Sequence, residues 1–179
     1  MALGHAERRI WLAVTDPAAT AQAREAGVGA RVRLTIGPGA QGAHDAATQV
    51  DADVLALPDG RLSYVGPYAR GVTRDMGETA LLGIGQLRIV LHARQLMEID
   101  PAPYIAAGLD PREAEVLQAK SHVSYRAGYA GVTDRSVVAD MPGPTAADLM
   151  LLPNARRPRP LFPFEDPPGR DPTRSEDPR

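Results

Sequence analysis

The sequence predicts a mixed α/β (α+β) fold in which strand–helix units carry an attached antiparallel β meander over about residues 30–93. Three observations predict it. Residues 10–14 form a short apolar run directly before an Asp-Pro pair, which is typical of a buried strand followed by a helix. Residues 30–36 alternate strictly between polar and apolar side chains, as in a half-buried strand. Glycine-containing turns then separate further apolar runs.

The first strand–helix unit has clear boundary residues. Asp16 fits a helix N-cap, Pro17 fits the first helical position, and Gly27 fits the position after the helix ends. Strand-to-helix turns of α/β sheets also collect at the edge where ligands bind. Asp16 is therefore a candidate ligand-binding residue as well as a cap.

The meander is predicted from alternation and turns. Residues 30–36 place their apolar side chains on one face, and residues 48–57 turn Asp51 and Asp53 outward into solvent. Asp59-Gly60 predicts a hairpin between this run and residues 61–65. Gly85-Gln86 joins residues 79–84 to residues 87–92. About five antiparallel strands are expected.

Later elements are short. Asp100-Pro101 begins a helix that Gly108 ends, and Asp110-Pro111 begins another capped turn. Residues 115–120 fit either a helix or a buried strand, since periodicity does not decide between them. A helix is expected over about residues 122–129 and a strand over residues 136–140. Residues 1–152 form the predicted domain, and residues 153–179 form a Pro/Arg-rich tail whose end is predicted to be disordered.

Composition excludes several classes of function. The 179 residues include 20 Lys+Arg and 22 Asp+Glu, a net charge of −2, which argues against a nucleic-acid partner. The sequence has no apolar run long enough to span a membrane and no secretory signal at its start, so a cytoplasmic location away from membranes is predicted. The absence of cysteine excludes disulfides, thiolate zinc sites and cysteine nucleophiles.

No metal or catalytic motif is present in the sequence. The four histidines, His5, His44, His92 and His122, are far apart and form neither H-x-H nor H-E-x-x-H. Phosphate-binding loops, dinucleotide fingerprints and nucleophile elbows are also missing. We therefore expect no metal ligand and assign no catalytic residue.

The densest group of candidate binding residues lies within residues 119–129. If a strand ends at Lys120 and a helix begins after Ser121, free backbone N–H groups and the helix dipole point to the same place. Such a place can hold an anion such as a carboxylate. The alternative is that Ser121 only caps the helix.

One face of the same predicted helix is polar and aromatic. His122, Arg126 and Tyr129 are spaced by four and three residues, which puts them in one stripe. The planar guanidinium of Arg126 suits a carboxylate. The alternative is that Arg126 pairs with a surface acid while the tyrosines fill the core.

Several ordered motifs resemble a known family. They are V-T-D-P-A-A-T-A-Q-A-R-E-A-G-V-G-A, Y-V-G-P-Y-A-R-G-V-T-R-D-M-G-E-T-A-L-L, A-K-S-H-V-S-Y-R-A-G-Y and D-M-P-G-P-T-A-A-D-L. Together, over about residues 10–164, they resemble the C-terminal domain of the microcystin-degradation protein MlrC family of zinc-dependent metallopeptidases. The resemblance implies that residues 115–120 are a strand. The family motif reads K-S-S-x-H-F-R-A, so Lys120, Ser121 and Arg126 match, while the histidine is displaced to His122.

The resemblance also implies that the two domains of the family have different roles. The family's N-terminal domain supplies the metal-binding residues, and this sequence begins where that domain would end. No zinc ligand is therefore assigned here; zinc is expected in an MlrC-like N-terminal domain acting in cis or in trans. This chain would shape either the cleft for a peptide-like or amide substrate or the interface between the two domains. On its own, it would lack activity. The alternative is a non-catalytic α/β binding or assembly module.

Overall fold

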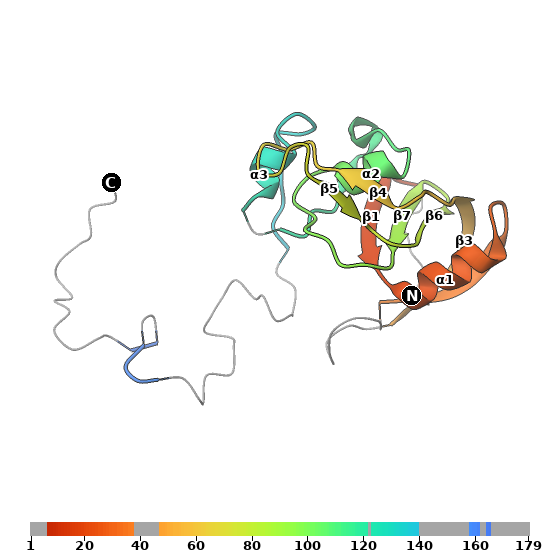
Figure 1. Ribbon diagram of the computed structural model, residues 1–179, viewed down its shortest axis with the longest axis horizontal. Coiled ribbons are helices and arrows are strands. Elements are labelled where there is room, and N and C mark those ends of the chain that lie inside the picture. Colours follow the sequence, from red (N-terminus) through yellow and green to blue (C-terminus); the bar gives the residue numbers. More distant parts are fainter. Residues whose placement is uncertain (1–6, 38–46, 122, 140–157, 162–163, 166–179) are drawn as a thin grey trace. The chain divides into compact units, whose positions relative to one another are not determined.

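The computed structural model describes residues 7–37, 47–121, 123–139, 158–161 and 164–165 (Figure 1). The chain divides into two compact units, residues 1–137 and 138–179. All helices and strands below belong to the first unit. The predicted domain boundary after residue 152 and the predicted disorder at the end of the tail lie outside the described residues.

A six-stranded mixed sheet confirms the predicted α+β class. Its strand order is β2-β3-β6-β7-β1-β8. Neighbours from β2 to β7 are antiparallel, whereas β1 is parallel to both β7 and β8. The strands are β1 (Ile10–Thr15), β2 (Arg31–Ile36), β3 (Thr48–Ala56), β6 (Thr79–Ile84), β7 (Leu87–His92) and β8 (Val116–Leu117).

The first strand–helix unit is built as predicted. Helix α1 (Pro17–Ala26) follows β1, and Asp16 is its N-cap. Asp16 Oδ1 accepts a hydrogen bond from Ala19 N at 3.0 Å, which satisfies one of the free N–H groups of the first turn. Gly27 ends the helix with a φ of 84°, a conformation that glycine adopts without strain.

The predicted alternation in β2 and β3 is confirmed. Leu34 and Val50 are buried, while Arg33 and Asp51 face solvent and pair across the strands at 2.8 Å. The hairpin of β6 and β7 turns at Gly85, as expected. The meander therefore contains β2, β3, β6 and β7, all in one sheet.

The predicted hairpin at Asp59-Gly60 is wrong. Strands β4 (Arg61–Ser63) and β5 (Thr73–Asp75) pair with each other in a separate two-stranded sheet and not with β3. Gly60 instead allows its backbone to lie close to that of Gly77, since a Cβ atom on Gly60 would lie 2.0 Å from Gly77 O. Gly60 O also accepts a hydrogen bond from Met76 N at 2.7 Å, which holds the chain away from β3.

The elements after β7 are short, as predicted. Helix α2 (Ala102–Ala106) follows Asp100-Pro101, and Gly108 follows it with a φ of 83°. The 3₁₀ helix η1 (Pro111–Glu113) is capped by Asp110, which accepts a hydrogen bond from Arg112 N. Within residues 115–120 the strand alternative is confirmed only over the two residues of β8.

Two predictions for the following segment are wrong. Helix α3 spans only Tyr125–Gly128, with Ser124 and not Ser121 at its N-cap. An isolated antiparallel bridge between Glu98 and Lys120 keeps the preceding chain extended, so the helix begins later. Residues 136–139 form no strand. Val137 is 96% exposed, because no neighbouring strand or helix offers it an apolar surface.

Apolar side chains fill both faces of the sheet. Leu12 and Val14 of β1 pack toward the cluster that contains Ala19 and Ala23 of α1. Trp11, on the opposite face of β1, packs against Tyr104 of α2 with ring centroids 6.1 Å apart. A third cluster lies beneath β4 and β5. Among the described residues, no helix has the length and apolar character needed to cross a membrane.

The buried cap at Asp16 gives the first prediction. Besides the N–H of Ala19, its carboxylate accepts the N–H of Gly37 at 3.1 Å, so replacement by alanine leaves one buried and one part-buried N–H donor without this partner. Asp16→Ala should lower the free energy of unfolding by about 2 kcal/mol, measured by urea denaturation. Asp51→Ala, which removes an exposed carboxylate, should lower the free energy of unfolding much less. An equal loss of unfolding free energy in the two variants would show that the Asp16 cap contributes no more to stability than a surface charge does.

Candidate ligand-binding groove

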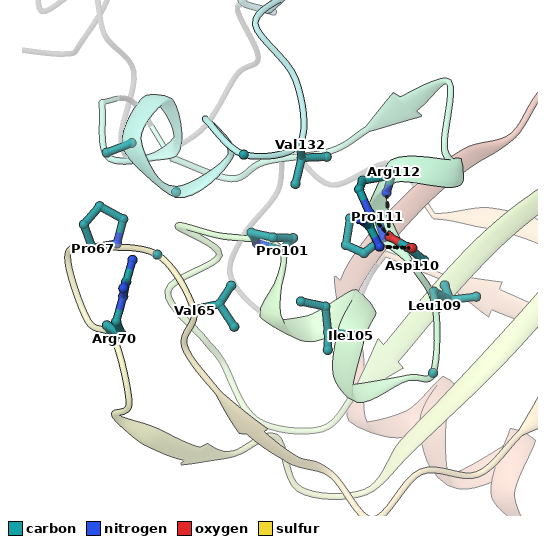
Figure 2. A pocket seen from close by; sticks show the side chains of 15 residues that line it. Val65, Pro67, Arg70, Pro101, Ile105, Leu109, Asp110, Pro111, Arg112 and Val132 are labelled. Carbon is teal, nitrogen blue, oxygen red and sulfur yellow. Dashed lines mark hydrogen bonds and ion pairs between the residues drawn. The ribbon is translucent and has the colours of Figure 1, made fainter.

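A groove of about 700 Å³ lies on the first unit, bordered by three segments of the chain (Figure 2). One side is the loop between β4 and β5, and the other is the chain from α2 to η1. Residues 127–132 complete the border. Val65, Pro101 and Ile105 give the groove an apolar centre. It is larger than a second hollow of about 300 Å³ that Tyr64, Arg74 and Met97 help to line.

Asp100 holds two of these segments together. Its side chain is 1% exposed. Oδ2 accepts hydrogen bonds from Val65 N at 2.8 Å and from Gly66 N at 2.7 Å, while Oδ1 accepts Ala102 N at 2.9 Å. Hydrogen bonds to a charged acceptor are stronger than neutral ones. The carboxylate therefore fixes the loop after β4 against the start of α2.

Two glycines bring the third segment into contact with this loop. A Cβ atom on Gly66 would lie 2.9 Å from Gly128 Cα, and a Cβ atom on Gly128 would lie 2.1 Å from Ile99 O. Real Cβ atoms do not approach so closely, so only glycine allows the two backbones to meet. Segments that carry two of the motifs noted in the sequence, around residues 64–71 and 119–129, thereby become neighbours.

The charged side chains of the groove differ in their pairing. On one side Arg112 binds Asp110 through two hydrogen bonds, with Nε to Oδ1 at 2.9 Å and Nη2 to Oδ2 at 2.6 Å. The hydrogen bond from Arg112 holds the pKa of the Asp110 carboxyl below its usual value. Arg70 lies on the opposite side (Figure 2). Within the described ranges, no carboxylate or carbonyl is bonded to its guanidinium.

The predicted anion-binding residues are only partly placed by the structure. Lys120 is exposed and Ser121 half-buried, in the extended chain before α3, and His122 lies outside the described residues. Arg126 is exposed on α3, with its guanidinium carbon 5.9 Å from the Tyr125 ring centroid. Because α3 begins later than predicted, its N-terminus does not lie beside Lys120 and Ser121. Their role in anion binding stays a prediction that now depends on the side chains.

The remaining candidate, Asp16, has a structural role. Both of its carboxylate oxygens accept backbone N–H groups, and the side chain is buried. Its own backbone N–H donates to His92 O at 3.0 Å, which ties the end of β1 to the end of β7. The helix-cap interpretation of Asp16 is confirmed, and its role as a ligand-binding residue stays a prediction.

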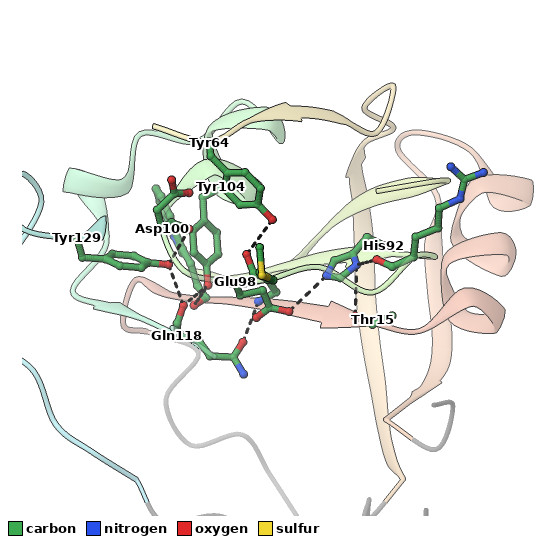
Figure 3. A network of polar contacts seen from close by, with 12 residues as sticks. Thr15, Tyr64, His92, Glu98, Asp100, Tyr104, Gln118 and Tyr129 are labelled. Carbon is green, nitrogen blue, oxygen red and sulfur yellow. Dashed lines mark hydrogen bonds and ion pairs between the residues drawn. The ribbon is translucent and has the colours of Figure 1, made fainter. Parts of the chain in front are cut away.

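A buried polar network lies near the ends of β1 and β7 (Figure 3). His92 and Glu98 are 0% and 4% exposed, and Nε2 of the histidine lies 3.7 Å from Oε1 of the glutamate. His92 Nδ1 lies 2.9 Å from Arg94 O and 3.4 Å from Thr15 Oγ1. In the described part of the chain, His92 Nε2 and Glu98 Oε2 have no hydrogen-bond partner.

Two tyrosines connect this network to the groove segments. Tyr104 OH, from α2, lies 2.9 Å from Gln118 O and 3.2 Å from Trp11 O. Tyr129 OH lies 3.2 Å from Asp100 O and 3.3 Å from Gln118 O. Each hydroxyl donates to these carbonyl oxygens, so the phenols join α2, β1 and the chain after α3 (Figure 3). The expectation that tyrosines fill the core holds for Tyr129.

Metal ligands do not gather in the described residues. No group of three or more histidine and acidic side chains lies close enough together there to hold a metal ion. His92 and Glu98 are only two such groups, and both are enclosed. No zinc-dependent step is therefore derived from the residues described in this chain.

Three residues of the site were not singled out in the sequence. Asp100 was interpreted only as the start of a helix, yet its carboxylate also holds a loop far away in the sequence. Glu98 follows an apolar strand without any local signal. Arg70 could have been found, because it lies in the Y-V-G-P-Y-A-R motif beside Gly66, and a glycine between large residues often marks a close backbone approach.

The fold and the groove together define an α+β domain with a groove formed by loops beside a mixed sheet. A family model described as the MlrC C-terminus matches residues 1–156, and the chain belongs to that family.

The chain is also similar to a solved structure. It is the crystal structure of "Putative metallopeptidase from Mesorhizobium sp. BNC1", with a TM-score of 0.77 and 28% sequence identity. The match covers 89% of this chain but 32% of that one, so this chain spans about a third of the length of the relative. A search of curated protein sequences gives no match.

The glycine contact gives a prediction with a matched control. Gly128→Ala would place Cβ 2.1 Å from Ile99 O, so it should lower the free energy of unfolding by about 2 kcal/mol despite alanine's higher helix propensity. A Cβ atom on Gly131 would meet nothing within 4 Å, so Gly131→Ala should change stability by less than about 0.5 kcal/mol. Urea denaturation of both variants measures the difference. A stabilised Gly128→Ala variant would contradict the close backbone contact.

The buried tyrosines give a prediction for alkaline pH. Burial raises the pKa of Tyr104 and the pKa of Tyr129 above the ordinary value. In the unfolded chain these phenols ionise near pH 10, while in the folded chain they stay neutral. Their contribution to stability is therefore complete below about pH 10 and is lost as the pH rises further.

Absorbance at 295 nm measures this ionisation directly. The hydrogen bond between Tyr125 and Ser136 lowers the pKa of the Tyr125 phenol, so a pH titration should show Tyr125 ionising in a first step and Tyr104 and Tyr129 ionising only together with unfolding. The Tyr104→Phe variant should lose one ionisation from the unfolding step and none from the first step. Ionisation of all tyrosines near pH 10 without unfolding would contradict their burial.

Proposed function

We propose that this domain forms one wall of the substrate cleft of an MlrC-like metallopeptidase or amide hydrolase. An MlrC-like N-terminal domain, joined to this chain or acting in trans, would hold the zinc ion. Zinc bound there would activate a water molecule for attack on an amide carbonyl. The proposal assigns this chain the tasks of binding and orienting a peptide-like substrate.

The observation that carries the proposal is the composition of the groove. Its borders include residues 65–67, Arg70 and residues 127–128, which belong to motifs that resemble the MlrC family. These segments are far apart in the sequence, and the Gly66–Gly128 contact brings them together. Loops held on a rigid sheet are the usual place for substrate contacts. Membership of the family and the likeness to the Mesorhizobium protein support the assignment to a metallopeptidase.

The side chains of Lys120, Ser121 and Arg126 are proposed to contact an anionic group of the substrate or the neighbouring domain. Lys120 and Arg126 are exposed and are therefore accessible to either. An arginine can bind a carboxylate through two parallel hydrogen bonds, which gives orientation as well as affinity.

A chimeric enzyme tests the proposal. Residues 1–156 of this chain would replace the matching part of a full-length family member, and zinc content and hydrolysis of a capped peptide library would be measured. The chimera should bind zinc and hydrolyse peptides, whereas the isolated chain should do neither. Hydrolysis by the isolated chain, or a folded, zinc-loaded chimera without activity, would contradict the proposal. The second result would favour the binding or assembly module.

The role of Arg126 is tested in the same chimera. Arg126→Gln should lower kcat/KM about tenfold, because one charge-assisted hydrogen bond to substrate or to the other domain is lost. Arg135→Gln removes another exposed arginine, one that does not belong to the motifs that resemble the family, and should leave kcat/KM unchanged. Equal kinetics of the two variants would contradict a role for Arg126.

A further inference from the structure

Within the part of the chain that the structure describes, one charge of the groove has no partner. Of the charged residues that line it, Arg112 is paired with Asp110 through two hydrogen bonds, so their charges cancel. Arg70 lines the opposite side, and in the described residues its guanidinium has no acidic partner. The groove therefore presents a net positive charge at the side of Arg70. A guanidinium offers five donors and no acceptor, so its complement is an anion.

The centre of the groove favours an apolar group. Val65 and Ile105 are large hydrophobic side chains that remain 42% and 45% exposed, and Pro101 lies between them (Figure 2). Grouped apolar side chains at a concave surface gain free energy when a ligand covers them. The glycines at the border carry no side chains that would fill the space.

We infer that the groove binds the carboxyl-terminal residue of a peptide, with an apolar side chain over Val65 and Ile105 and its carboxylate on Arg70. The inference rests on the proposed function for the assignment of this ligand as substrate, and it names the substrate class and a specificity-determining residue. A single arginine suits a group with one negative charge. Phosphate groups are usually held by several cations or by a row of backbone N–H groups.

The rigidity of the groove supports such selectivity. The loop that leads to Arg70 is fixed at Val65 and Gly66 by the buried carboxylate of Asp100. Ile105 lies on α2, whose first N–H group is held by the same carboxylate. The apolar surface and the loop that carries the cation therefore share one anchor, and little ordering is needed when the ligand binds.

Titration of the full chain with small probes tests the inference. N-acetyl-L-leucine supplies the amide, the apolar side chain and the carboxylate, and N-acetyl-L-leucinamide has the same shape without the charge. In ¹⁵N-HSQC spectra, N-acetyl-L-leucine should shift the amide resonances of Val65, Gly66 and Gly128, with an affinity about tenfold higher than that of the amide. Binding of the acid should weaken at high salt.

Matched variants locate the two contacts. Arg70→Gln should lower the affinity for N-acetyl-L-leucine about tenfold, to the level of the amide. Arg61→Gln removes an exposed arginine outside the groove and should leave the affinity unchanged. Ile105→Ser should weaken both probes alike, because it removes apolar contact and no charge. The HSQC spectrum of each variant reports whether the fold is retained.

The outcomes separate clearly. Equal affinity for acid and amide, an unchanged affinity in Arg70→Gln, or no shifts in the groove would each overturn the inference. None of these measurements involves zinc or hydrolysis. An inactive chimera together with selective probe binding would reject the proposed function alone, while an active chimera without probe selectivity would reject only this assignment of the groove.

Discussion

The buried carboxylate of Asp100 is the contact on which the candidate site depends. It accepts N–H groups from the loop after β4 and from the first turn of α2, two segments that share no strand pairing. A charged group so deeply buried is tolerated only with several donors around it. Its position also places Gly66 beside Gly128, so one side chain determines how three separate parts of the chain border the groove.

The mixed sheet explains why polar groups gather nearby. Strand β1 is parallel to β7 in a register that pairs Thr15 with His92, so the carboxyl ends of these two strands meet at one edge, whereas β8 ends beside Trp11. Thr15 Oγ1 lies 3.4 Å from His92 Nδ1 at this edge. Open α/β sheets commonly use this edge for ligands, but here the edge holds the enclosed side chains of His92 and Glu98. The accessible groove is consequently formed by the loops.

Local sequence signals correctly predicted those elements whose ends and burial depend on residues that are neighbours in the chain. Asp16, Pro17 and Gly27 determine the ends of α1 through their own backbone chemistry, and the alternation of β2 reports burial of one face directly. The prediction of a hairpin at Asp59-Gly60 was wrong because Gly60 makes a close backbone contact with Gly77, which no local pattern reveals. The helix after Lys120 was predicted too long for a similar reason, since a bridge to Glu98 keeps that segment extended.

The candidate site was less predictable than the fold. Arg126 and Lys120 were named from motif and spacing, whereas Arg70 and Asp100 acquire their importance only through tertiary contacts. An aspartate before proline has the same local appearance whether or not its carboxylate holds a distant loop. The family resemblance carried more information about the site than helix spacing, because it joined segments that the chain separates widely.

The topology also has a consequence for synthesis on the ribosome. Thr15 and His92, at the ends of the paired strands β1 and β7, are 77 residues apart, and Arg9 N donates to the Glu115 carboxylate 106 residues later. Within this domain, β1 must therefore wait, without its partners β7 and β8, until most of the domain has been translated. Such long-range closure slows folding and leaves an apolar segment exposed to chaperones in the meantime.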